Sequence, residues 1–205
     1  MSLVMGFLCD QYVLLCGDTQ INYDNEEKGL ISKVYSFNKD IVWGFTGNVN
    51  NNIDIIRPYL NDDLSIDQTK TVNITFDDLC GNIYHNYYIP ALEKYKQTGI
   101  SSDLNCFIGG YKDGHFLLQN YTVIESTQYE ELLISESGFL KHRIMGKTEH
   151  ESNLKLLLPN YFPTIQEMIN IFQNILDIGI TFDTTINNYM TYVYLEIGGE
   201  NNVEI

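Results

Sequence analysis

Short apolar runs separated by polar turn residues fill the first 45 positions of the chain. The runs are residues 3–9 and 12–16, separated by Asp10-Gln11, and residues 32–37 and 41–45, separated by Asn38-Lys39-Asp40. Aliphatic and β-branched runs of this length, joined by residues that tolerate tight turns, predict β-hairpins. Two hairpins are therefore expected, with a polar stretch at 20–29 between them.

Helical spacing follows these hairpins. Apolar residues three and four positions apart predict a short helix over 48–60. Thr75 can cap a longer helix that runs toward residue 95, although Pro90 must kink or break it. Gly99 is the expected end of that helix.

The second half of the chain begins with a third predicted hairpin. Runs at 104–111 and 116–121 flank Lys112-Asp113-Gly114, and Asp-Gly between apolar runs is a strong hairpin signal. Residues 126–138 form a polar, acidic connection to which no element is assigned. Residues 140–145 are expected to form another strand.

The last 60 residues predict two helices and a strand. The first helix is expected over 148–158 and closed by Pro159, and the second begins at Thr164, with Glu167 completing a capping box. Residues 190–197 combine aromatic and β-branched positions, which favours a final strand.

The order of elements and the length set the fold class. Strands, two helices, strands, two helices and a last strand predict an α+β protein in which helices cover the faces of antiparallel sheets. A chain of 205 residues with 44% hydrophobic positions can bury one substantial core, so a single domain over 1–205 is expected. Two stacked sheets between helix pairs satisfy this order.

Charge and composition exclude several classes of partner. With 12 basic and 27 acidic residues the formal charge is −15, which disfavours nucleic acid and anionic lipid as partners. The sequence contains no apolar span of membrane length, and its start lacks the features of a secretory signal, so a cytoplasmic location is expected. The four cysteines and four histidines show no metal-ligand spacing, and no metal or cofactor is predicted.

Five stretches, taken in order, resemble a known family: the proteasome β-subunits and bacterial HslV-type peptidases, which are N-terminal-nucleophile hydrolases. These stretches are "SLVMGF", "LLCGDTQ", "SKVYSFN", "VWGFTGN" and "CFIGGYKDGHFLLQNY". They are similar to the family's first two strands, its Lys-Val strand, its Gly-containing turn and its central hairpin. The resemblance implies a four-layer α-β-β-α sandwich.

The resemblance also implies a catalytic set made of Ser2, Asp18, Lys33 and Gly47. An N-terminal serine or threonine can act as a nucleophile because its own α-amine accepts the hydroxyl proton. Removal of Met1 would free Ser2, the Lys33 charge would lower the pKa of the amine and hydroxyl, and Asp18 would hold Lys33. The N–H group of Gly47 would stabilise the oxyanion.

Each of these residues also has a structural interpretation. Ser2 can be a polar residue at a frayed start, Asp18 a turn residue, Lys33 a solvated strand position and Gly47 a turn before a helix. Where the family has a Gly-Ser-Gly motif, this chain has Lys147, and Asp183 is the nearest counterpart to a later family carboxylate. The roles of Lys147 and Asp183 remain open at this stage.

Two functions follow. The first is hydrolysis of a peptide or amide bond by an N-terminal serine in a homo-oligomer, and the second is a proteasome-like scaffold or binding subunit without catalysis. The departure at Lys147 favours the second hypothesis, whereas the joint spacing of the four candidate residues favours the first.

Overall fold

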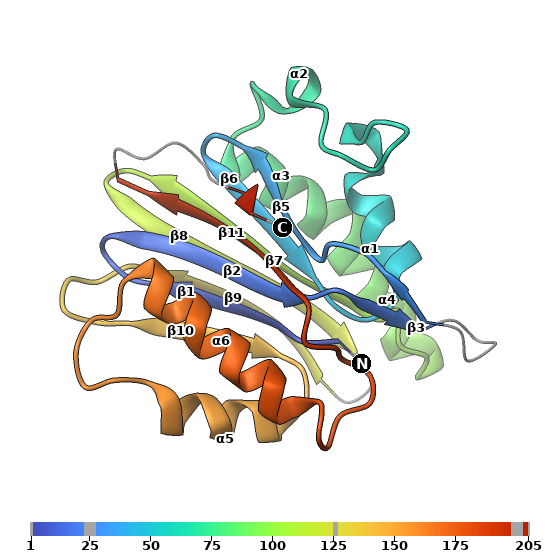
Figure 1. Cartoon of the computed structure of the whole chain (residues 1–205). Coiled ribbons are helices and arrows are strands. Elements are labelled where there is room, and N and C mark those ends of the chain that lie inside the picture. The colour runs from blue at the N-terminus through green and yellow to red at the C-terminus, as the bar shows by residue number, and fades with distance from the viewer. Residues whose placement is uncertain (1, 23–27, 125–126, 198–202, 205) are drawn as a thin grey trace.

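The computed structural model describes residues 2–22, 28–124, 127–197 and 203–204 (Figure 1). The strands are β1 Val4–Leu8, β2 Tyr12–Asp18, β3 Gln20–Asn22, β4 Lys28–Leu30, β5 Val34–Asn38, β6 Ile41–Phe45, β7 Leu104–Lys112, β8 His115–Ile124, β9 Thr127–Ile134, β10 Lys141–Met145, β11 Met190–Glu196 and β12 Val203–Glu204. The helices are α1 Val49–Ile56, α2 Gln68–Thr71, α3 Phe76–Ile83, α4 Ile89–Thr98, α5 Thr148–Leu157 and α6 Ile165–Gly179, with a 3₁₀ turn at Arg57–Tyr59 and a π-helical segment at Tyr84–Tyr88.

Two five-stranded antiparallel sheets form the body of the molecule. One sheet has the strand order β10-β1-β2-β11-β12 and the other has the order β5-β6-β7-β8-β9. Strand β1 pairs with β10 on one side and β2 on the other, so the beginning of the chain occupies an interior position of its sheet. Strands β3 and β4 form a separate small pair.

Three apolar clusters hold these elements together. One lies between the β5–β9 sheet and helices α1, α3 and α4, a second lies between the β1-containing sheet and helices α5 and α6, and a third lies between the two sheets. Strand β1 contributes side chains to two of these clusters. Met5 and Phe7 belong to the cluster under α6, whereas Val4 and Leu8 belong to the cluster between the two sheets. Burial on both faces explains the continuous apolar run at the start of the sequence.

The hairpin predictions are confirmed. Strands β1 and β2, β5 and β6, and β7 and β8 pair as expected. In the third hairpin, Asp113 and Gly114 both adopt positive φ, at 51° and 83°, which is the geometry that makes Asp-Gly favourable in a two-residue turn. Strands over 140–145 and 190–197 are also present as β10 and β11.

The helix predictions are confirmed with one refinement. Thr75 and Thr164 cap α3 and α6 through capping boxes, and Gly99 ends α4 at φ 68°. Pro90 does not break the long helix. The chain widens into the π-helical segment just before it, because Pro90 has no N–H with which to bond the preceding turn.

Two polar stretches contain strands that the pattern did not predict. Residues 127–134 form β9 at the edge of a sheet, where one face meets solvent and the polar residues of the sequence are tolerated. The polar stretch at 20–29 contributes β3 and β4, although residues 23–27 lie outside the described part.

The predicted fold class is confirmed as a mixed α and β protein built on antiparallel sheets. The four-layer α-β-β-α arrangement stays a prediction. Within the described ranges, no helix has the length and apolar character needed to cross a membrane. Of the four free cysteines, Cys9, Cys16 and Cys106 are buried, as expected from their apolar neighbours.

Candidate functional site

A buried ion pair lies at the end of β2. Lys33 Nζ lies 2.7 Å from Asp18 Oδ2, and the two side chains are 1% and 0% exposed. Lys33 also donates to the carbonyl oxygen of Gln20 at 2.5 Å. Lys33 immediately precedes β5, so the pair joins the ends of strands that belong to different sheets.

Backbone groups complete the shell of the carboxylate. Asp18 Oδ1 accepts the Leu3 N–H at 2.7 Å, and Oδ2 accepts the Gln20 N–H at 3.0 Å. A further backbone bond runs from the Asp18 N–H to the Leu3 carbonyl at 3.0 Å. Asp18 therefore fixes the first residues of the chain as well as Lys33.

Burial perturbs both members of the pair. Desolvation raises the pKa of Asp18, against the opposing effects of Lys33 and the backbone donors. Desolvation also lowers the pKa of Lys33, although Asp18 opposes the change. Both shifts show that burial opposes the charged forms and that the attraction between the two groups offsets this cost in part.

Ser2 lies directly beside this pair along the chain. It precedes Leu3, whose N–H and carbonyl are both bonded to Asp18, and its side chain is half-buried. On its other side is Gly146, at the end of β10, where an added Cβ would lie 3.5 Å from the Ser2 carbonyl oxygen. The geometry thus brings Ser2, Asp18 and Lys33 into one neighbourhood.

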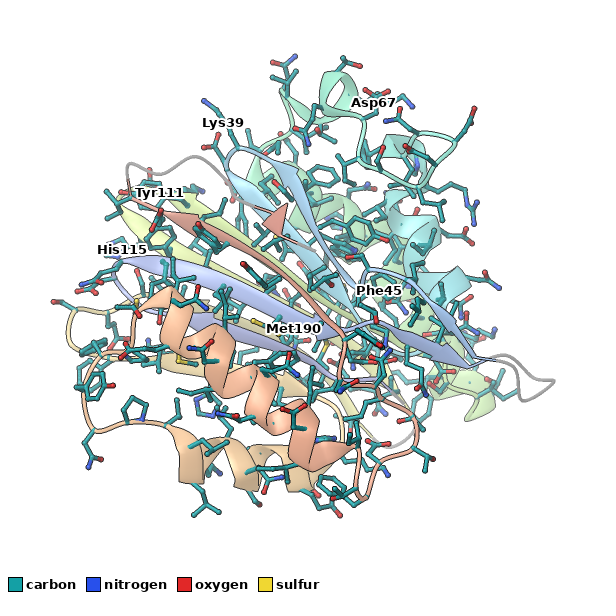
Figure 2. All side chains as sticks on the ribbon, viewed as in Figure 1. Lys39, Phe45, Asp67, Tyr111, His115 and Met190 are labelled. Atoms are coloured by element: carbon teal, nitrogen blue, oxygen red, sulfur yellow. The ribbon has the colours of Figure 1, made fainter. Side chains whose placement is uncertain are left out.

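Gly47 belongs to the same end of the sheets. It follows β6, and the N–H of Phe45 donates to the Lys33 carbonyl at 2.9 Å. Gly47 has φ 83°, and a Cβ there would lie 2.8 Å from the Asp103 carbonyl oxygen. Backbone conformation and close packing therefore require glycine at this position, independently of any catalytic role. Figure 2 labels Phe45 and Met190, and Met190 pairs with Asp18, so the two labels mark this end of the sheets.

A second polar cluster, which the sequence reasoning did not assemble, lies next to Gly146. Asp183 Oδ1 lies 3.3 Å from Lys147 Nζ, and Asp183 Oδ2 lies 3.2 Å from His150 Nε2. Asp183 also accepts the Thr185 N–H at 3.0 Å and the Thr185 hydroxyl at 2.6 Å. The cluster ties the beginning of α5 to the turn after α6.

These donors decide the charge state of Asp183. Burial alone would raise its pKa, but hydrogen bonds from Thr185, His150 and Lys147 outweigh that effect and lower the pKa to about 2. The carboxylate is therefore ionised at neutral pH. No sequence signal could have found this cluster, because 33 residues separate His150 from Asp183 and only the fold brings them together.

The segment that follows Asp183 lies against the end of β2. Gln20 Nε2 donates to the Thr184 carbonyl at 2.9 Å, and the Thr19 N–H donates to the Tyr189 carbonyl at 3.1 Å. The two polar clusters are thus connected through residues 184–189. Among the described residues, no group of three or more His, Cys, Asp or Glu side chains is placed to hold a metal ion.

The comparisons with known proteins show a likeness in structure and none in sequence. No family model matches the chain, and no curated protein sequence matches it. The structure is similar to that of Anbu (ancestral beta-subunit) from Yersinia bercovieri, with a TM-score of 0.66 and 11% sequence identity over 98% of this chain and 86% of that chain. At this identity the likeness shows that the two proteins share a fold and nothing beyond the fold.

The family assignment drawn from the sequence is therefore wrong. Five short similarities suggested membership of the proteasome β-subunits and HslV-type N-terminal-nucleophile hydrolases, yet no family model matches and the structural neighbour is only 11% identical. The quoted stretches are mainly strand and turn sequences, which the architecture alone can impose. Any function must consequently be argued from the residues of the site.

Proposed function

We propose that this protein hydrolyses amide or peptide bonds with Ser2 as the nucleophile, after cleavage of the bond between Met1 and Ser2. One observation carries the proposal: the buried Asp18–Lys33 pair is hydrogen-bonded to the backbone of Leu3. A buried charge pair is costly unless its interactions compensate for the lost hydration. Its position beside Ser2 gives it a chemical use.

In the proposed reaction, the free α-amine of Ser2 accepts the hydroxyl proton as Oγ attacks the substrate carbonyl. The Lys33 ammonium lowers the pKa of the amine and hydroxyl, and Asp18 holds Lys33 in position. The Gly47 N–H donates to the developing oxyanion, a contribution of about 3 kcal/mol in comparable sites. The C–N bond breaks as the leaving amine takes the proton, and water then hydrolyses the ester on Ser2.

The proposal also includes a layer order for the fold, an oligomeric state and a cellular location. The three apolar clusters support a four-layer α-β-β-α order. The similar structure is described as an ancestral beta-subunit, which supports assembly of several copies of this chain. Light scattering after size-exclusion chromatography would measure that assembly. Free thiols in all four cysteines support a reducing, cytoplasmic location.

The second candidate is a scaffold or binding subunit without catalysis. It is favoured by the two hydrogen bonds that already engage the Lys33 ammonium and by its 1% exposure. In this case the ion pair only fastens the start of β1 to β5. The two candidates predict the same fold and differ in whether Ser2 reacts.

Intact mass spectrometry followed by a serine-reactive β-lactone separates them. The protein is expressed from its own start codon without an N-terminal tag, its mass is measured, and it is incubated with the probe. The expected result is loss of Met1 and a single adduct on Ser2, absent from Ser2→Ala. Ser152→Ala, at an exposed position on α5, is the matched control and should be labelled like the wild type.

The same experiment can overturn the proposal. Retained Met1, or a free Ser2 that stays unlabelled while the protein is folded, excludes an N-terminal serine nucleophile. A normal oligomer under those conditions would establish the scaffold.

A further inference from the structure

A cavity that none of the proposed catalytic residues lines lies between α6 and the outer face of its sheet. Its volume is about 500 Å³, and it is bounded by the start of β2, the first turn of α6 and the second half of β11. In Figure 1, α6 crosses the sheet on the β1 side, and among the described residues no helix lies over β11. Tyr192 and Tyr194 are accordingly only half-buried.

Three tyrosines are among the residues that line this cavity: Tyr12, Tyr192 and Tyr194. Tyr12 is 2% exposed, and its hydroxyl donates to the Pro163 carbonyl at 2.9 Å, which fixes the ring. Tyr192 and Tyr194 are two positions apart on β11, so both point to the same face of the sheet. All three tyrosines belong to strands of the sheet, and Ile169 of α6 adds an apolar side chain to the lining.

The charges around the cavity are negative. Glu196 follows Tyr194 on the same face of β11 and is exposed. Among the described residues that line the cavity, none is lysine, arginine or histidine. At the start of α6, the capping box bonds the N–H groups of Thr164 and Glu167, and the Glu167 carboxylate places a second negative charge at this end of the helix.

We propose that this cavity binds a small organic cation, with the tyrosine rings contacting its apolar body and Glu196 balancing its charge. Aromatic rings attract a cation placed over their faces, and a quaternary ammonium group combines charge with a weakly hydrated surface. The formal charge of −15 for the whole chain adds a favourable long-range field. The ligand is either a free ammonium compound or a methylated lysine side chain on a peptide.

Binding can be measured by ¹H–¹⁵N NMR titration of the full chain with choline chloride. The matched probe is 3,3-dimethyl-1-butanol, which has the shape of choline without its charge. An acetylated, amidated trimethyl-lysine serves as the peptide-like probe. Choline is expected to bind at least about tenfold more tightly than the neutral alcohol, with shifts in the amides of β11.

Variants test the two parts of the cavity. Tyr194→Leu is expected to weaken choline binding about 5- to 30-fold, whereas Tyr194→Phe keeps the ring and should retain it. Glu196→Gln should weaken choline but leave the neutral alcohol unchanged. Glu130→Gln, an equivalent exposed change on β9 of the other sheet, is the charge control.

The outcomes are decisive in each direction. Tighter binding of trimethyl-lysine than choline assigns the cavity to a peptide side chain, and the reverse assigns it to a free cation. Equal binding of choline and the neutral alcohol, or no shift in β11 with either cationic probe, overturns the proposal. None of these results depends on whether Ser2 is a nucleophile.

Discussion

Replacement of Lys33 by methionine should destabilise the protein strongly, because it leaves the Asp18 carboxylate without its counter-ion. Asp18 is 0% exposed and lies 2.7 Å from the ammonium. Removal of one partner from a buried ion pair costs about 3–5 kcal/mol. Asp18 keeps the Leu3 and Gln20 N–H donors, so the lower end, about 3 kcal/mol, is expected.

The pH dependence of this cost has a definite sign. Burial already raises the pKa of Asp18, and loss of the lysine charge would raise it further. The folded variant then binds a proton more readily than the unfolded chain. Its deficit relative to wild type should be largest at pH 7 and should shrink as the pH is lowered.

Urea denaturation monitored by circular dichroism measures the effect. Lys155→Met is the matched control: Lys155 also lies 2.7 Å from its partner, Glu151, but the side chains are 63% and 48% exposed. That variant should lose at most about 0.5 kcal/mol. The double variant Asp18→Asn/Lys33→Met should be more stable than Lys33→Met alone, because no buried charge remains.

Two results would refute this reasoning. One is a loss below about 1 kcal/mol for Lys33→Met, which would mean that the carboxylate is well compensated by its backbone donors. The other is a double variant whose loss equals the sum of the single losses, since independent sites add and a coupled pair does not.

Three further predictions concern single side chains. Gly47→Ala should lower the melting temperature more than Gly99→Ala. Both positions have positive φ, but only at Gly47 would the new Cβ approach a backbone oxygen, at 2.8 Å. Equal losses in melting temperature would contradict the packing argument. Asp183→Asn should lower the free energy of unfolding by about 2 kcal/mol at pH 7, because the pKa of Asp183 in the folded protein is lowered to about 2. Urea titrations should show this difference from wild type shrinking as the pH falls from about 4 toward 2. A difference that stays constant with pH would be evidence against the ionised carboxylate. Phe172→Ala should cost about 3–5 kcal/mol, because the ring is 0% exposed under α6; a loss typical of a surface position would show that α6 is not packed as described.

Sequence pattern predicted those elements whose local signal agrees with their environment. The Asp113-Gly114 turn and the Thr75 and Thr164 caps each combine a specific backbone requirement with a flanking apolar run, and each was placed correctly. Strand β9 was missed for the opposite reason. As an edge strand it pairs through its backbone with β8 alone, so its polar side chains carry little information about the pairing.

In the candidate site, too, some contacts were expected from the sequence and others were not. Asp18 and Lys33 are 15 positions apart, and their pairing was expected from the resemblance and not from the local pattern, which does not place the ends of two hairpins side by side. Lys147 and Asp183 were noticed singly, but their contact depends on where α6 ends relative to α5. No spacing rule covers such a contact, because it is set by the packing of two helices and an irregular segment.

The two polar clusters differ in what their burial implies. Asp183 receives hydrogen bonds from three residues, and its pKa is lowered, so these contacts stabilise the ionised carboxylate and anchor residues 184–189. Asp18 has a raised pKa and Lys33 a lowered one, so the ion pair retains an electrostatic cost that its contacts do not fully offset. Perturbed ionisable groups of this kind concentrate at functional sites, although structural pairs also show them. The direction of these shifts therefore makes the Ser2 side of the molecule, rather than the Lys147 cluster, the first place to look for chemistry.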